Sequence, residues 1–211
     1  MKKETPQNIV YNHVRGQILS RALFPGNRIV EEEIVQATGV SRTSIRPALL
    51  HLAYEGLVEL IPNRGAFVAR PTREDMLRVY RVRRVLECGA LEEALAARTD
   101  GQLAAMAANL TEQEALTEHY TRQEYVALNH RFHWMLVEMA GNPYYEKYLK
   151  EIYNRINTFL LFYDNAVDNK SLESHRMIYE ALRDRDTEKG LQGIRLDVDL
   201  ALEDLHTDVD F

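Results

Sequence analysis

The segment from Gly39 to Arg46 constrains the fold of this chain more than any other part of its sequence. Ser41 stands where a helix N-cap is expected, directly before a run of apolar residues with helical spacing. Four of these residues predict the buried face of the helix: Ile45, Ala48, Leu49 and Leu52. Thr43 and Arg46 fall outside this face, and Arg42 lies at its edge. Hydroxyl and guanidinium groups at the front of an exposed helix suit phosphate oxygens and guanine edges, so the pattern predicts a DNA-reading helix.

The segments on either side of this helix predict a small domain around it. Two further helices and two strands are expected, at residues 7–21, 31–37, 57–61 and 66–69. The two strands are joined by a tight turn that carries Arg64 and Gly65. Three helices followed by a β-hairpin make a winged helix-turn-helix, and we expect the tip of the wing to approach phosphates or the minor groove.

Charge is distributed unevenly along the chain, in the direction that DNA binding requires. The 211 residues carry a net charge of −6, but residues 1–70 hold nine Lys/Arg against six Asp/Glu. Residues 71–211 hold seventeen basic and twenty-six acidic residues, a balance of −9. This asymmetry predicts that the first segment meets an anion. A single cysteine, Cys88, and the lack of a membrane-spanning run or signal peptide favour a cytoplasmic protein that forms no internal disulfide.

The rest of the chain is expected to form an all-helical second domain. Residues 71–72 are interpreted as a linker between a first domain at 1–70 and a second at 73–211, with Thr72 as the cap of a long helix. Helices are predicted at residues 73–97, 100–117, 122–140, 143–165, 171–184 and 187–206. The fold is therefore expected to be mainly α, with a C-terminal bundle of about six helices.

Polar side chains on the inner faces of these predicted helices indicate a binding site. Asn129 and His133 lie four residues apart on the apolar face of one helix. His175 begins an apolar stripe on a second helix, and Asp197 lies within the stripe of a third. Burying such a group without a partner costs about 1–3 kcal/mol. We therefore expect these groups to converge on a ligand or an ion, with a hydrogen-bonded polar cluster, or a pocket whose histidines contact the effector, as the alternatives.

The first 70 residues resemble the GntR family of bacterial transcription regulators. The matching segments are Leu23 to Ile29, Gly39 to Thr43, Arg46, Leu52, Glu55 to Val58 and Arg64 to Val68. The resemblance implies DNA contacts from the recognition-helix residues Ser41, Arg42, Thr43, Ser44 and Arg46, and from the wing residues Arg64 and Gly65. It also implies a homodimer that binds a palindromic operator in double-stranded DNA.

One residue of the predicted recognition helix departs from the family pattern. Pro47 stands where the family usually has an acidic residue. Proline inside a helix removes a backbone hydrogen bond and tends to kink it. The departure concerns the angle at which Arg46 meets DNA, and it leaves the operator sequence open.

The second domain resembles the FCD effector domain of the FadR-like subgroup. Its matching residues include Arg83, Leu86, Glu87, Phe132, Gly141, Asn142, Ile178, Ala181, Leu182 and Asp186. Many members hold a divalent metal with one Asp and three His. Here His133 and His175 match that pattern, Asn129 replaces the Asp, and Asp197 replaces the last His. The resemblance implies a Zn, Ni or Mn site at these four residues, weakened by the amide ligand.

The resemblance also implies a small organic acid as the effector. Arg83 and Glu87 lie four residues apart on the long helix 73–97. They predict either a plain salt bridge or an effector clamp, since a guanidinium group grips a carboxylate through two hydrogen bonds.

The leading interpretation is an effector-controlled transcription regulator, most simply a repressor, and not an enzyme. The alternative is a metal-dependent enzyme acting on a small organic acid at His133, His175 and Asp197. Against this enzyme interpretation, no general-base or nucleophile motif is found beside these residues. A regulator that has lost effector sensing is the third interpretation, because two of the four ligand positions are altered.

Overall fold

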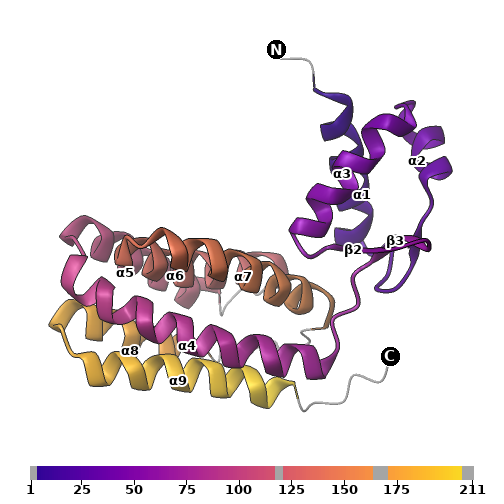
Figure 1. The fold of residues 1–211 in the computed structure, drawn as a ribbon. Coiled ribbons are helices and arrows are strands. Elements are labelled where there is room, and N and C mark those ends of the chain that lie inside the picture. The colour runs from indigo at the N-terminus through magenta and orange to yellow at the C-terminus, as the bar shows by residue number, and fades with distance from the viewer. Residues whose placement is uncertain (1–3, 117–120, 164–170, 206–211) are drawn as a thin grey trace. The chain divides into compact units, whose positions relative to one another are not determined.

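The computed structural model describes residues 4–116, 121–163 and 171–205 (Figure 1). The chain divides into two compact units, Met1–Pro71 and Thr72–Phe211, which are described separately below. The ends of three predicted helices, at residue 117, residues 164–165 and residue 206, lie outside the described part of the chain. The mainly α fold expected from the sequence is confirmed, since a small sheet accompanies nine helices in the described residues.

The three helices of the N-terminal unit share one apolar core. They are α1 (Pro6–Leu19), α2 (Glu31–Thr38) and α3 (Arg42–Tyr54). α1 begins at Pro6 because the Thr5 hydroxyl accepts a hydrogen bond from the Asn8 amide, and proline is compatible with the first helical position. α2 ends at Gly39, whose φ of 68° is the left-handed conformation that glycine adopts readily. α1 packs against α3, whose buried residues are the four predicted from spacing, Ile45, Ala48, Leu49 and Leu52.

The wing of this unit contains one more strand than the sequence predicted. Its strands are β1 (Arg28–Ile29), β2 (Val58–Ile61) and β3 (Gly65–Val68), arranged antiparallel in the order β1-β3-β2. The predicted hairpin is β2 and β3, and its turn places Asn63 and Gly65 at φ values of 60° and 103°. β1 was missed because two residues are too few to show an alternating pattern, and only the pairing with β3 defines them as a strand.

The helix predicted to read DNA forms as one continuous element with Pro47 inside it. Ser41 has the extended N-cap backbone, with φ −66° and ψ 151°, but it makes no side-chain capping bond. Its Oγ instead lies 2.9 Å from Thr43 Oγ1. Ile45 and Ala48, which flank the proline, are fully buried. We infer that this burial holds the helix together where Pro47 removes one backbone hydrogen bond.

The C-terminal unit is the expected bundle of six helices. They are α4 (Arg73–Ala97), α5 (Asp100–Leu116), α6 (Arg122–Ala140), α7 (Pro143–Tyr163), α8 (Ser171–Asp184) and α9 (Thr187–Asp204). The Thr72 hydroxyl caps α4 as predicted, by accepting from the Asp75 amide at 3.2 Å. Among the described residues, no helix is both long and apolar enough to cross a lipid bilayer.

Two glycines allow α9 to approach its neighbours closely. A Cβ atom at Gly190 would lie 2.6 Å from the Leu91 side chain of α4, and one at Gly193 would lie 3.1 Å from the Ile178 backbone of α8. Both distances are shorter than ordinary carbon contacts. The close approach brings α9 beside α4, which carries Arg83 and Glu87, and beside α8, which carries His175 of the site described next.

Candidate functional site

The exposed face of α3 presents the polar residues that the sequence selected. Arg42, Thr43 and Arg46 are exposed, and Ser44 is half-buried. Arg46 makes no ion pair with any residue that the structure describes. Arg42 is paired with Glu32 of α2, a contact between two exposed side chains. The face therefore combines one free guanidinium group with one that must leave a carboxylate before it can meet another anion.

The wing adds a second basic surface to this unit. Arg64 and Gly65 lie exposed in the turn between β2 and β3, and the Arg64 guanidinium carbon is 5.8 Å from the centre of the Phe67 ring. Pairing of β1 with β3 brings an additional exposed residue, Arg28, beside the wing, where a Cβ on Gly65 would lie 3.9 Å from its guanidinium. Sequence reasoning missed Arg28 because its position depends on the unpredicted strand.

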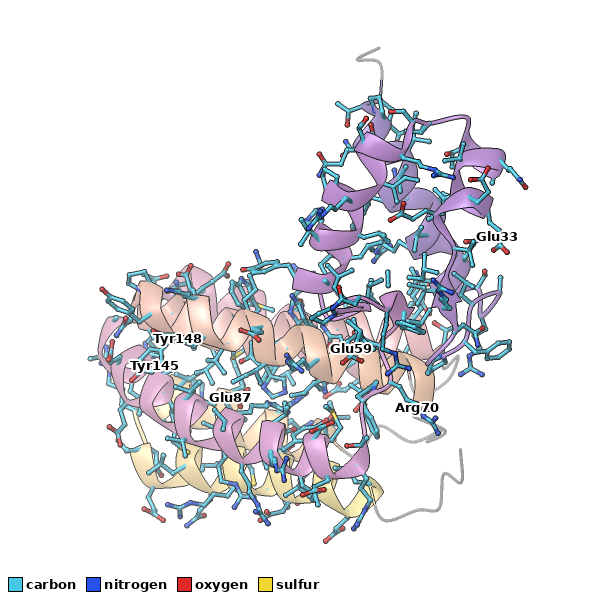
Figure 2. All side chains as sticks on the ribbon, turned by 45° about the vertical axis from the view of Figure 1, so that its right-hand side comes forward. Glu33, Glu59, Arg70, Glu87, Tyr145 and Tyr148 are labelled. Atoms are coloured by element: carbon cyan, nitrogen blue, oxygen red, sulfur yellow. The ribbon has the colours of Figure 1, made fainter. Side chains whose placement is uncertain are left out.

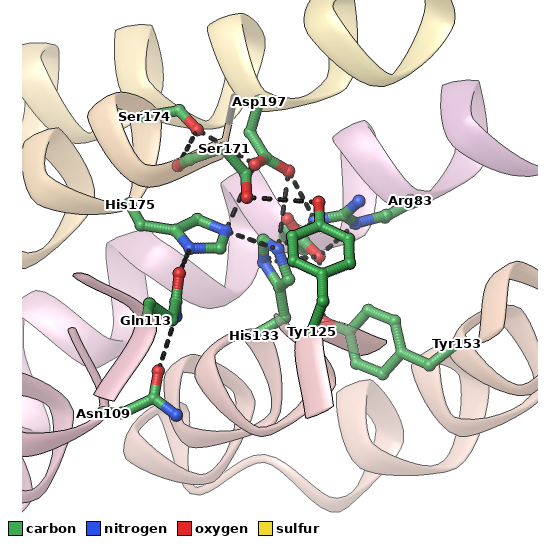
Figure 3. Close-up of polar contacts among 11 residues, drawn as sticks. Arg83, Asn109, Gln113, Tyr125, His133, Tyr153, Ser171, Ser174, His175 and Asp197 are labelled. Carbon is green, nitrogen blue, oxygen red and sulfur yellow. Dashed lines mark hydrogen bonds and ion pairs between the residues drawn. The ribbon is translucent and has the colours of Figure 1, made fainter. Parts of the chain in front are cut away.

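The second candidate site is buried in the helical unit, and three of its four predicted metal ligands meet there (Figure 3). His133 of α6, His175 of α8 and Asp197 of α9 are all buried, and one donor atom from each lies within 4.8 Å of the others. His175 Nε2 is 3.1 Å from His133 Nε2 and 3.3 Å from Asp197 Oδ1. These three residues are called the His–His–Asp cluster below.

Arg83 of α4 enters the same site and contacts two members of the His–His–Asp cluster. Its Nη2 lies 2.7 Å from Asp197 Oδ2 and 2.6 Å from His133 Nε2. Its Nε donates to Glu87 Oε1 at 2.6 Å, so the predicted i,i+4 ion pair is present. Only 3% of Arg83 and 0% of Glu87 are exposed. The effector residues and metal ligands expected from the sequence therefore belong to one buried group of charges (Figure 3).

Asn129, the fourth predicted ligand, is not brought into this group. It is only half-buried, and it makes no hydrogen bond to the His–His–Asp cluster. It precedes His133 by four residues on α6, a displacement of about 6 Å along a helix axis. Sharing a helical face with His133 is thus insufficient to place its amide within bonding distance of the cluster.

Four polar residues of the site were missed by sequence reasoning. Gln113 Oε1 lies 2.8 Å from His175 Nδ1, and Asn109 Oδ1 accepts from Gln113 Nε2 at 2.7 Å. Ser174 Oγ lies 3.0 Å from Asp197 Oδ1, and the Tyr153 hydroxyl donates to Glu87 Oε1 at 2.9 Å. Asn109 and Gln113 carry a usable signal, since both lie four residues apart on the buried face of α5 together with Leu103, Met106 and Leu110.

Burial and the central guanidinium group together set the protonation states of this site. Burial disfavours the charged imidazolium and Arg83 repels it, so the pKa of His133 is well below its usual value. Burial opposes ionisation of Asp197, but Arg83 and the two imidazoles outweigh it and lower the pKa of that carboxyl. Burial raises the pKa of the Glu87 carboxyl and, with Glu87 beside it, the pKa of the Tyr153 hydroxyl.

The donor types of the His–His–Asp cluster fit a divalent ion. Two imidazoles and one carboxylate are ligands that suit Zn²⁺, Ni²⁺ and Mn²⁺, and three protein ligands leave a coordination position open for a further group. Two of these residues, His133 and Asp197, also bond to Arg83, which is a permanent cation. The site is therefore suited to positive charge, and a positive side chain already lies in it.

Comparison with known proteins identifies the family of each of the two units. Residues 6–68 match the model of bacterial regulatory proteins of the gntR family, and residues 78–196 match that of the FCD domain. The chain is 27% identical to the HTH-type transcriptional regulator YdhC of Bacillus subtilis, covering 92% of this chain and 88% of that protein. It is 26% identical to the HTH-type transcriptional repressor RspR of Escherichia coli, covering 84% and 78%. The solved structure of E. coli McbR/YncC has the same fold, with a TM-score of 0.77 at 20% identity over 97% of this chain and 98% of that one.

A winged helix-turn-helix joined to an FCD domain defines a DNA-binding transcription regulator. The chain belongs to the GntR family, among the members that carry an FCD domain. The family models and the relatives are those of transcription regulators and not of enzymes, which confirms that the chain is a transcription regulator and argues against the metalloenzyme interpretation.

Proposed function

We propose that this regulator binds a palindromic operator as a homodimer through α3 and the wing of each subunit. Arg46 carries this proposal, since it is exposed and makes no ion pair among the residues that the structure describes. A guanidinium group in this state at the front of a helix can reach guanine edges in the major groove. Arg42, Thr43 and Ser44 extend the same surface, and Arg64 and Gly65 extend it along the wing. Ser41 begins the helix and offers its hydroxyl to a phosphate.

An exposed apolar face of the helical unit supports a dimer. Val82 and Val85 of α4, together with Tyr144 and Tyr148 of α7, are large exposed side chains, and Val85 is 71% exposed. α4 and α7 pack together, and Figure 2 shows Tyr145 and Tyr148 near one end of this unit. A twofold axis would let this face bury itself against the same face of a second copy.

A small organic acid is the effector we propose for the buried site. Arg83 is the natural partner for its carboxylate, and Glu87 presents a buried Oε2 with no hydrogen-bond partner among the described residues. An unsatisfied buried oxygen beside a guanidinium group is costly unless a ligand, a water or a proton meets it. Ligand binding there would shift DNA affinity only by preferring one arrangement of the regulator over another.

A divalent metal is the cofactor we propose for this site, held by His133, His175 and Asp197. When bound, it would act as a Lewis acid that attracts the carboxylate of the effector. Asn129 was predicted as the fourth ligand, and it would join only after a local movement of α6. Repression is the mode of regulation we propose, in line with the relative that is named a repressor.

Two binding experiments test this function. The first measures binding of full-length protein to a DNA fragment recovered by in vitro selection, in which we expect a twofold-symmetric consensus and one dimer per site. The second screens small organic acids by thermal shift, with and without Zn²⁺, because a ligand that binds the native state raises the melting temperature. Failure to enrich any sequence would contradict the proposal for α3, and failure of every acid would contradict the proposal for the buried site.

A further inference from the structure

A relay of amides fixes how His175 faces the His–His–Asp cluster. The Leu128 carbonyl can only accept, so the group that bonds to it at 3.3 Å is the Asn109 amide nitrogen. Asn109 Oδ1 then accepts from Gln113 Nε2, which leaves Gln113 Oε1 to accept from His175 Nδ1. The Leu128 carbonyl therefore fixes the proton of His175 on Nδ1, acting through the side chains of Asn109 and Gln113. The Nε2 atom of His175 then faces the cluster.

The His–His–Asp cluster is therefore a buried site that favours positive charge. His175 Nε2 faces Asp197 Oδ1 at 3.3 Å and His133 Nε2 at 3.1 Å, so atoms that carry lone pairs are held close together. Such atoms repel one another unless a cation or a proton lies among them. Arg83 supplies a cation at one side of this site, through its contacts with His133 and Asp197.

We propose that Arg83 is a built-in competitor of the metal at the His–His–Asp cluster. A divalent ion and the guanidinium group require lone pairs of the same two residues, His133 and Asp197. Two cations in a buried site also repel each other strongly. Metal entry therefore displaces Arg83 from both residues and leaves it paired with Glu87. The freed guanidinium group then faces the metal-filled site and is available to an acidic ligand, which deepens the proposed effector site and rests on it.

Isothermal titration calorimetry of the full-length protein with zinc chloride tests this competition, because it measures the affinity for Zn²⁺. Arg83→Met keeps much of the side-chain volume and removes the charge. We expect R83M to bind Zn²⁺ about 10- to 100-fold more tightly than the wild type, the range seen when groups around metal ligands are changed. Arg83→Lys keeps the charge on a shorter reach, and its affinity should fall between the two.

The matched control is Arg84→Met, on the next residue of the same helix. Arg84 pairs with Asp199 of α9, two residues beyond Asp197, so the control removes the same charge from an ion pair between the same two helices. Its Zn²⁺ affinity should equal that of the wild type. If R83M fails to fold, as judged by circular dichroism, Arg83→Gln retains a hydrogen bond to Glu87 and takes its place.

Equal or weaker Zn²⁺ binding by the folded Arg83 variant would overturn the proposal. A second readout is the melting temperature of the helical unit, monitored through the only tryptophan, Trp134 on α6. Zn²⁺ should raise this temperature more in R83M than in the wild type, because the metal replaces the lost charge. Neither measurement involves DNA, so a failure of operator binding and a failure of the competition are distinguishable.

Discussion

The two units of this regulator place arginine in opposite environments, one exposed and one buried. In the N-terminal unit Arg46 is exposed and makes no ion pair within the described residues, whereas in the C-terminal unit Arg83 is 3% exposed and bonds to Glu87, His133 and Asp197. An exposed guanidinium group contributes little to stability and remains available to a partner. A buried one is tied to its neighbours, so removing any of them has a large cost. The first arrangement suits docking on a polyanion, and the second suits sensing.

We expect the largest effect on stability at Asp197, which is a partner of the buried arginine. Asp197→Ala leaves Arg83 buried without its carboxylate partner, which should lower the free energy of unfolding of the helical unit by about 3–5 kcal/mol. Urea unfolding monitored by Trp134 fluorescence measures this unit, because the chain has one tryptophan. Asp199→Ala removes a carboxylate that is 56% exposed, and it should cost less than about 1 kcal/mol. Equal losses in the two variants would remove the distinction between buried and exposed ion pairs.

Arg46 should show the reverse behaviour, with a large effect on DNA and little on folding. We expect Arg46→Ala to weaken binding to the selected operator by about 1–3 kcal/mol, through loss of a contact to a base edge. Fluorescence anisotropy at fixed salt concentration measures the change. Arg131→Ala is the control, because it removes the same charge from an exposed position of the helical unit. Unchanged affinity in Arg46→Ala would exclude α3 as the reading element.

Protonation of His133 should affect the stability of the helical unit only. Its pKa is lowered in the folded state, so the unfolded chain binds more protons once the pH falls below the usual histidine value of 6.5. Stability is therefore complete above this value and decreases below it, by at most about 1.4 kcal/mol per pH unit for one proton. Urea unfolding from pH 7.5 to 5.5 measures the slope, and His133→Asn should reduce it. An unchanged slope in that variant would assign the pH dependence to another group.

The smallest effect is expected at Glu32, which forms an ion pair with Arg42 of the N-terminal unit. This is the counterpart in that unit of the ion pairs that hold Arg83. Glu32→Gln frees Arg42 from an exposed ion pair that must open before Arg42 can bind phosphate. Such pairs contribute about 0.2–1 kcal/mol, so DNA affinity should rise by up to about fivefold. Glu33→Gln removes the same charge from the neighbouring position of α2 and serves as the control. A decrease in affinity would indicate that Glu32 positions Arg42 or contacts a base.

The sequence predicted the two units unequally well. In the N-terminal unit, spacing predicted α3 and its buried face, because one amphipathic helix is a local property of its own residues. β1 and Arg28 were beyond reach because only a neighbouring strand defines them. In the helical unit the convergence of His133, His175 and Asp197 was predicted from polar residues on apolar faces.

What the sequence could not provide was the way the helices rotate against one another. That rotation leaves Asn129 outside the site and brings Gln113 and Tyr153 into it. It also joins Arg83 to the predicted metal ligands, which the sequence analysis treated as a separate group. Helix faces follow from periodicity, whereas contacts between faces depend on packing, which includes the close approach that Gly190 and Gly193 allow.

Coupling between the buried site and the DNA-binding surface is the most direct test of this regulator's mechanism. The measurement is operator affinity of the full-length protein with and without a saturating organic acid identified by thermal shift. We expect the acid to change the dissociation constant at least about fivefold, a coupling of 1 kcal/mol, in the wild type and in Arg84→Met but not in Arg83→Met. An acid that binds the wild type with Arg83-dependent affinity and leaves operator affinity unchanged would contradict sensing through this site.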